Sequence, residues 1–185
     1  MPKTLGRVLA SAVATIALAG CGDDDNKVKG PPPAAPEQIQ LTSSAFEEGG
    51  EIPLLYTCDG ADLSPPLSWR HVPKETKAVA LLMEDPDASG GTFVHWTWFA
   101  PLTEQRDLPE GQGAVRAVDG KNSYGKSFYR GPCPPKGDKP HRYVFVIYAL
   151  RSVPKLKRGA SPDEMRAEIK KLALARGVLT GTSGR

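Results

Sequence analysis

The chain has 185 residues, of which 24 are lysine or arginine and 21 are aspartate or glutamate, giving a formal net charge of +3. This balance, and the lack of any basic run interleaved with aromatic residues, argues against a nucleic-acid-binding protein. The 19 glycines and 18 prolines lie mostly between apolar runs and predict a strand-rich domain with elaborate loops.

The N-terminus has the layout of a secretory signal. A short basic start precedes an apolar stretch of roughly 12 residues, too short to span a bilayer. Its end, Leu18-Ala19-Gly20-Cys21, resembles a bacterial lipobox, in which the signal 1–20 is removed and the cysteine is diacylated. The alternative is an ordinary signal peptide that happens to contain a cysteine. The lipobox predicts a stable membrane anchor, because two or more acyl chains hold a protein firmly.

Residues 22–36, GDDDNKVKGPPPAAP, are polar and then proline-rich, with no periodic apolar positions. Such a composition is typical of a linker, so we expect residues 21–36 to comprise lipidated Cys21 and a flexible tether. Residues 37–185 then form one folded domain. The protein is expected in the bacterial cell envelope. Gly22, by resemblance to enterobacterial lipoproteins, favours the periplasmic side of the outer membrane.

Four apolar runs have the composition of β-strands: QIQLTS, KAVALLME, TFVHWTWFA and HRYVFVIYAL. The last two are apolar on both faces, as expected of central strands in a covered sheet. Strict alternation puts His95 on one face with Thr97 and Phe99, and His141 on one face with Tyr143. Each histidine lies near a strand end, where loops begin and functional sites are usual.

One helix is predicted near the C-terminus, in SPDEMRAEIKKLALARG. Ser161 can cap it, Pro162 suits its first turn, Glu164 can complete a capping box and Gly177 can end it. VLTGT after the helix is expected to form a last short strand. Three apolar residues at helical spacing are expected to contact the core: Met165, Ile169 and Leu172.

With Cys21 lipidated, Cys58 and Cys133 are the two cysteines left in an oxidising compartment. A disulfide between them would close a loop of about 75 residues and contribute on the order of 4 kcal/mol in the chain-entropy model. Two buried free thiols or a soft metal pair are the alternatives. Neither cysteine is in a CxxC arrangement, which argues against zinc.

Several motifs of the domain resemble those of one family. They are YTCDGADLSPPLSW at 56–69, DPDASGG and HW within 85–96, YGKSFYRGPCPPKG at 124–137 and HRYVF at 141–145. Their order and spacing are similar to those of the phosphatidylethanolamine-binding proteins (PEBP), in the bacterial branch called Raf-kinase-inhibitor-like (YbhB/YbcL type). The resemblance implies a mainly β fold, with a large central antiparallel sheet packed on a smaller sheet and a C-terminal α-helix.

The resemblance also implies a pocket for phosphate-like or carboxylate anions, including phosphoethanolamine-type headgroups. Ser89 stands where the family usually has proline in DPDAP, which predicts a less rigid loop here. Carried over position by position, the ligand-binding residues are Asp85, Asp87, His95, Gly131, Pro132, Cys133, Pro134, Pro135, His141 and Tyr143.

A carboxylate beside an anion site is understandable if it orients a histidine. Asp85 accepting a hydrogen bond from an imidazole would fix the tautomer and favour the imidazolium. Charge-assisted bonds from His95 and His141, a phenolic donor from Tyr143 and loop N–H groups would then hold phosphate oxygens.

Three functions from different classes are consistent with these features. The first is a membrane-anchored envelope protein that binds a small anionic ligand or a phospholipid headgroup. The second, suggested by eukaryotic relatives, is an inhibitor or interaction protein acting on a protease or kinase. The third is a hydrolase, for which the sequence offers neither GxSxG nor HExxH. We expect the first, without enzymatic activity, cofactor or metal.

Overall fold

The computed structural model describes residues 27–185. The predicted signal peptide 1–20 and the predicted lipidation of Cys21 therefore lie outside the described residues. Within residues 27–185, no helix is both long and apolar enough to cross a membrane.

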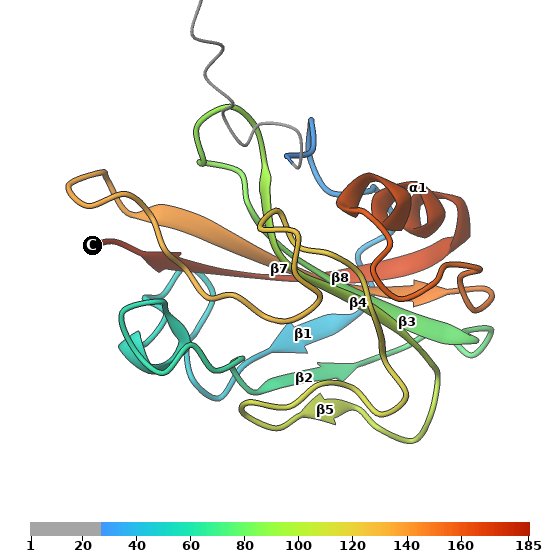
Figure 1. Ribbon diagram of the computed structural model, residues 1–185. Coiled ribbons are helices and arrows are strands. Elements are labelled where there is room, and N and C mark those ends of the chain that lie inside the picture. The colour runs from blue at the N-terminus through green and yellow to red at the C-terminus, as the bar shows by residue number, and fades with distance from the viewer. Residues whose placement is uncertain (1–26) are drawn as a thin grey trace, which may run out of the picture.

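In the described part of the chain, two antiparallel sheets and one α-helix are stacked in three layers (Figure 1). The strand order is β6-β4-β3-β7-β8 in the larger sheet and β1-β2-β5 in the smaller. The smaller sheet lies on one face of the larger sheet and α1 covers the other (Figure 1). The predicted mainly β fold is confirmed. The elements are β1 (Gln40–Thr42), the 3-10 helix η2 (Leu54–Tyr56), β2 (Leu67–Arg70), β3 (Ala78–Asp85), β4 (Phe93–Pro101), β5 (Asp107–Leu108), β6 (Val118–Asp119), β7 (His141–Leu150), α1 (Pro162–Leu172) and β8 (Ala173–Ser183).

The larger sheet is buried on both faces because its central strands carry apolar side chains on both. All eight residues of β3 are buried. Leu81, Phe145 and Trp98 belong to the core between the two sheets, whereas Leu82 and Val146 belong to the core under α1. This double cover explains why the runs that form β3, β4 and β7 are nearly continuous in apolar residues.

The C-terminal helix begins as predicted and ends sooner. Ser161 and Glu164 form the capping box through bonds of 3.3 Å and 2.7 Å. The helix stops at Leu172 and β8 follows at once, so the expectations that Gly177 ends the helix and that only a short strand follows were wrong. Cross-strand pairing with β7 overrides the helical propensity of ALAR. A Cβ on Gly177 would lie 2.3 Å from the carbonyl oxygen of Ile39, which explains the glycine.

The N-terminal segment (residues 27–36) packs on the domain, so the prediction of a flexible tether up to residue 36 needs correction. Val28 forms an isolated bridge with Thr92 and is only 1% exposed. The carbonyl oxygen of Pro33 accepts a hydrogen bond of 2.9 Å from the Tyr148 hydroxyl. A proline-rich segment lacks periodicity, yet its carbonyls can still be held by side chains of the fold. The described domain therefore includes residues before 37.

Candidate functional site

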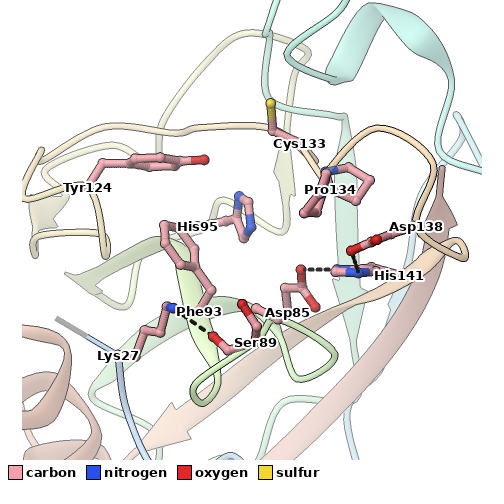
Figure 2. A pocket seen from close by; sticks show the side chains of 12 residues that line it. Lys27, Asp85, Ser89, Phe93, His95, Tyr124, Cys133, Pro134, Asp138 and His141 are labelled. Atoms are coloured by element: carbon pink, nitrogen blue, oxygen red, sulfur yellow. Dashed lines mark hydrogen bonds and ion pairs between the residues drawn. The ribbon is translucent and has the colours of Figure 1, made fainter. Parts of the chain in front are cut away.

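A cavity of about 170 Å³ opens at one end of the larger sheet, where three strands meet loops (Figure 2). Asp85 is the last residue of β3, Phe93 the first of β4 and His141 the first of β7. The volume corresponds to about five or six water molecules at about 30 Å³ each, enough for a phosphate-sized group. The lining residues are Lys27, Asp85, Ala88, Ser89, Phe93, His95, Tyr124, Cys133, Pro134, Pro135, Asp138 and His141.

A β-bulge places His95 at this cavity. Met83 pairs with Trp96, but the next residue, Glu84, pairs with Val94, so His95 is an extra residue in β4. A bulge of this kind re-aims side chains and is common beside functional sites.

The bulge changes the predicted face of His95. Phe99 lies in the core under α1, where strict alternation would also place His95. Instead the His95 ring lies 5.0 Å from the Phe93 ring and 5.2 Å from the Tyr143 ring, on the side of the smaller sheet. His141 shares that face with Tyr143 by ordinary alternation. The two histidines therefore meet at one cavity because of an irregularity that periodicity does not reveal.

Asp85 orients His141. The Asp85 carboxylate oxygen Oδ2 lies 2.8 Å from His141 Nδ1, and both side chains are nearly fully buried. The other carboxylate oxygen accepts the backbone N–H of Asp87 at 2.8 Å. His141 Nδ1 thus donates to Asp85, as expected for a carboxylate that fixes a tautomer. The opposite ring nitrogen, Nε2, lies 3.9 Å from a carboxylate oxygen of Asp138.

His95 has a different electrostatic state from the one predicted. Its Nδ1 lies 2.9 Å from the carbonyl oxygen of Arg130, to which Nδ1–H donates. Burial lowers the pKa of His95, which favours the neutral ring. The lowered pKa disfavours the imidazolium predicted at this position and favours a neutral imidazole with its lone pair on Nε2.

Asp87 does not line the cavity. Its carboxylate accepts the Arg142 backbone N–H and Nε–H at 2.9 Å each, and Nη2–H at 2.6 Å. The hydrogen bonds from the Arg142 side chain lower the pKa of Asp87 to about 2. In this structure Asp87 forms an ion pair with Arg142 and lies outside the cavity lining, so the geometry does not support its predicted ligand role.

Three further residues predicted as ligands also lie outside the lining. Tyr143 is fully buried, with its ring under His95, and burial raises the pKa of its hydroxyl. Gly131 packs so closely that a Cβ would lie 2.2 Å from the carbonyl oxygen of Tyr56. Pro132 uses its carbonyl oxygen to accept the N–H of Cys58 at 3.0 Å. These residues support the wall, while Asp85, His95, Cys133, Pro134, Pro135 and His141 form it.

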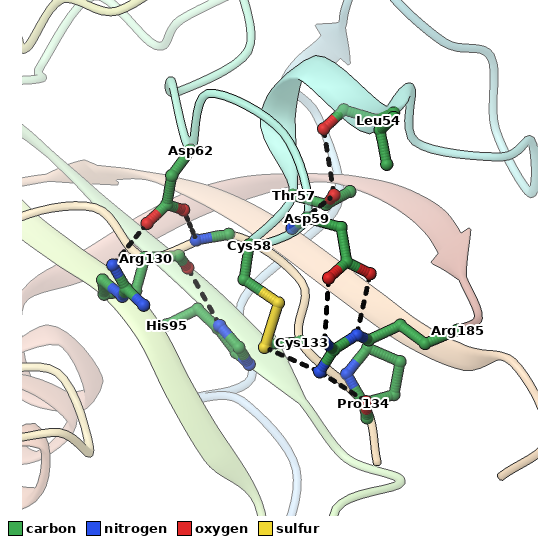
Figure 3. The surroundings of a disulfide bond; sticks show 11 residues. Leu54, Thr57, Cys58, Asp59, Asp62, His95, Arg130, Cys133, Pro134 and Arg185 are labelled. Atoms are coloured by element: carbon green, nitrogen blue, oxygen red, sulfur yellow. Dashed lines mark hydrogen bonds and ion pairs between the residues drawn. A yellow bond between two sulfur atoms is a disulfide. The ribbon is translucent and has the colours of Figure 1, made fainter. Parts of the chain in front are cut away.

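Cys58 and Cys133 form the disulfide that the sequence left open (Figure 3). Because Cys133 lines the cavity, the bond ties this wall to the loop after η2. Arg185 adds a second fastening: its Nε and Nη2 donate to the two carboxylate oxygens of Asp59 at 2.8 Å each. Its Nη1 lies 3.5 Å from the carbonyl oxygen of Pro134. The proline-containing wall is thus held by a covalent bond at Cys133 and by a polar contact at Pro134.

Sequence reasoning missed several lining residues. Tyr124, which is 46% exposed, packs edge-on against Phe93 at 4.7 Å, and the Arg130 guanidinium lies 5.7 Å from the Tyr124 ring centre. Tyr124 belongs to the motif at 124–137 and Asp138 directly follows it, but the sequence does not indicate where either side chain points. Lys27 lies in the segment predicted as a tether, and nothing in the sequence indicates that it lines a cavity. Within residues 27–185, no three His, Cys, Asp or Glu residues are grouped to hold a metal ion.

Comparisons with known proteins agree with this architecture. The profile of the family described as phosphatidylethanolamine-binding protein matches residues 42–184. A UPF0098 protein of Aquifex aeolicus is 42% identical over 135 residues, covering 71% of this chain and 77% of the relative. The Mycobacterium tuberculosis protein named as a lipoprotein, LppC, is 33% identical over 199 aligned positions, covering 98% of each chain.

Solved structures give the same result. The structure of Escherichia coli YbcL, described as a member of the mammalian PEBP family, superposes with a TM-score of 0.76. It is 30% identical in sequence, and the match covers 80% of this chain and 99% of YbcL. CT736 from Chlamydia trachomatis, described as a homologue of the same family, has a TM-score of 0.74 and 36% identity, with coverage of 80% and 99%.

Proposed function

The chain belongs to the phosphatidylethanolamine-binding protein family, and we propose that its cavity binds a small phosphate-bearing or carboxylate-bearing ligand. The single observation that carries the proposal is the meeting of His95 and the Asp85–His141 pair at one phosphate-sized cavity. His141 begins β7, and His95 lies near the start of β4 in a bulge between paired residues, so the sheet positions both histidines. Such pre-organisation is what a small polar site requires.

The chemistry proposed for His141 is donation to an anion. With Nδ1–H bonded to Asp85, a protonated His141 ring would present Nε2–H to a ligand oxygen. His95, being neutral with its proton on Nδ1, has Nε2 as an acceptor. The pair therefore favours a ligand that has both anionic oxygens and an O–H or N–H donor. Monobasic phosphate and phosphoethanolamine meet that description.

We further propose that the protein is lipid-anchored in the cell envelope and takes its ligand at the membrane surface. The relative named as a lipoprotein, LppC, supports the anchor. Cys21 precedes Lys27 by only six positions, and Lys27 lines the cavity. Six residues span at most about 20 Å. An acylated Cys21 would therefore keep the cavity close to the bilayer, within reach of phospholipid headgroups.

Anchoring has a direct test. Mass spectrometry of the protein from membranes should find a diacylglycerol on Cys21, and Cys21→Ser should release the protein into the soluble fraction. Recovery of the Cys21→Ser variant in the membrane fraction would contradict the anchor.

Ligand binding is tested by calorimetry with inorganic phosphate, phosphoethanolamine and acetate. His141→Ala should weaken phosphate binding about tenfold or more, because hydrogen bonds to charged groups contribute about 1.5–3 kcal/mol. His71→Asn is the matched control, since His71 lies on an exposed loop with a φ of 62° that asparagine accepts. No binding by the unmodified protein, or equal binding by His141→Ala, would overturn the proposal.

We propose binding without turnover. Incubation with phosphomonoester and carboxylic ester substrates should release no product above the background of the His141→Ala variant. Product formation that is lost in that variant would instead favour a hydrolase.

A further inference from the structure

The N-terminal segment supplies a side chain to the cavity. Lys27 is among the lining residues, and its ammonium group donates to the carbonyl oxygen of Ser89 at 2.6 Å (Figure 2). Ser89 belongs to the loop between β3 and β4, so the lysine joins two segments that are 62 positions apart. Residue 27 lies outside the stretch 42–184 that the family profile matches. The family likeness therefore assigns nothing to this lysine.

The backbone beside Lys27 is fixed on the β4 side. Val28 and Thr92 exchange two backbone hydrogen bonds of 3.0 Å each, which form a short antiparallel bridge. Thr92 immediately precedes β4, whose first residue, Phe93, lines the cavity. The position of Lys27 therefore follows the position of β4, which contributes Phe93 and His95 to the cavity lining.

The backbone after Lys27 is fixed on the helix side. The Arg166 guanidinium of α1 donates to the carbonyl oxygens of Lys29 and Gly30 at 3.0 Å and 2.9 Å. Arg166 is itself held by the buried carboxylate of Glu84, with Nε 3.0 Å from a carboxylate oxygen. The segment that carries the Lys27 charge is bonded both to the residue before β4 and to α1. It is therefore pre-organised, which lowers the entropic cost of binding a ligand with this lysine.

The cavity needs a cation if it binds an anion. Two carboxylates, those of Asp85 and Asp138, are among its lining residues, and burial lowers the pKa of His95, which favours its neutral form. Like charges repel, so the carboxylates oppose an anion unless positive charge offsets them. Among the described lining residues, Lys27 is the one lysine or arginine. Figure 2 shows it on one side of the cavity and His141 on the other.

We propose that Lys27 is an anion-binding residue of this cavity, and that the N-terminal segment is therefore part of the site. The proposal rests on the proposed function and names the group recognised: a phosphate, free or in a headgroup, attracted by Lys27 from one side and by His141 from the other. A domain cut at residue 37 or at residue 42 would lack this charge.

The test compares three variants of the full-length chain in detergent, titrated with inorganic phosphate by calorimetry at about 20 mM and about 300 mM salt. Lys27→Met removes the charge and keeps the length of the side chain. Lys27→Arg keeps the charge. Lys29→Met is the matched control, because Lys29 is exposed on the same segment, does not line the cavity and is held through its carbonyl oxygen.

At low salt, Lys27→Met should weaken phosphate binding about two- to fivefold, as expected for a partly solvated ion pair. Lys27→Arg should stay within about twofold of the unmodified protein, and Lys29→Met should be unchanged. High salt should shrink the difference between Lys27→Met and the unmodified protein, because ions screen the interaction. Vesicles that contain phosphatidylethanolamine and vesicles of phosphatidylcholine alone, compared with free phosphate, then distinguish a headgroup from a soluble ligand.

The outcomes separate this inference from the proposed function. Phosphate binding that Lys27→Met leaves intact would overturn the role of Lys27 and leave the cavity proposal standing. Equal losses in Lys27→Met and Lys27→Arg would show that the lysine only supports the loop through Ser89. Equal losses in Lys27→Met and Lys29→Met would indicate a general surface charge. No phosphate binding by the unmodified protein would overturn both proposals.

Discussion

Two neighbouring carboxylates on β3, Glu84 and Asp85, lie on opposite sides of the same strand and have different surroundings. Glu84 faces α1 and forms an ion pair with Arg166 of that helix. Asp85 faces the loops, pairs with His141 and lines the cavity. Both are nearly fully buried, with exposures of 1% and 3%. A buried charge pair alone therefore does not mark a binding site.

The Glu84–Arg166 and Asp85–His141 pairs differ in what lies next to them. On the helix side, Arg166 divides its donors between Glu84 and the carbonyls of the N-terminal segment, which fastens the chain to α1. On the cavity side, Asp85 bonds one ring nitrogen of His141, and the other, Nε2, is available at the cavity of about 170 Å³. We infer that the helix side stabilises the fold and that the cavity side is where the ligand binds. The following predictions test that division.

The largest expected effect is on the helix side. Arg166→Ala leaves the Glu84 charge buried without its partner and should lower the free energy of unfolding by about 3–5 kcal/mol in urea titration. Arg142→Ala, which removes an exposed partner of Asp87, is the control. A loss below about 1 kcal/mol for Arg166→Ala would contradict the inference that the helix side stabilises the fold.

A smaller loss is expected for the disulfide. Replacing Cys58 and Cys133 together by serine should lower the free energy of unfolding by about 2–4 kcal/mol, because the closed loop no longer restricts the unfolded chain. Since Cys133 lines the cavity, phosphate affinity should fall as well. Unchanged affinity in the still-folded double variant would show that the cavity wall does not depend on the bond.

The two sides should respond to pH in opposite directions. Burial raises the pKa of Glu84 from 4.5 to about 7, so its contribution to stability is complete below about pH 4.5 and is lost as pH rises through about 7. Burial lowers the pKa of His95 from 6.5, so its contribution is complete above about pH 6.5 and is lost as pH falls. Thermal unfolding of each variant is measured across pH 4–8. Glu84→Gln should remove the loss of stability as pH rises, and His95→Gln should remove the loss of stability as pH falls. If neither substitution changes the pH profile, these two groups do not control it.

The smallest effect concerns Asp87, which sequence reasoning placed among the ligands. Asp87→Asn should cost less than about 1 kcal/mol of stability, because its partner Arg142 is largely exposed. Phosphate affinity should stay within about twofold by calorimetry, since Asp87 does not line the cavity. A tenfold loss of affinity would restore the predicted ligand role.

The sequence predicted the fold well because its signals are local. Continuous apolar runs indicated β3, β4 and β7, and the capping residues around Ser161 located the start of α1. The short strands β5 and β6 carry too few residues for a periodic signal. The beginning of β8 was mistaken for helix because only pairing with β7 distinguishes the two.

The site was predicted less completely. The motifs identified Asp85, His95 and His141, but the bulge that brings His95 to the cavity depends on cross-strand register. Whether a motif residue faces the space or supports it depends on tertiary packing, as Tyr143 and Asp87 demonstrate. Lys27 reaches the cavity through contacts with segments distant in sequence, and composition alone suggested a linker there.

The most direct test of the central claim uses the three histidines of the chain, His71, His95 and His141. Nitrogen NMR spectra of histidine-labelled protein, recorded during a titration with inorganic phosphate, report on each ring separately. The account predicts that the His95 and His141 ring signals shift together and saturate at one phosphate per protein, while His71 does not move. Unchanged His95 and His141 signals, or shifts of all three rings alike, would contradict it.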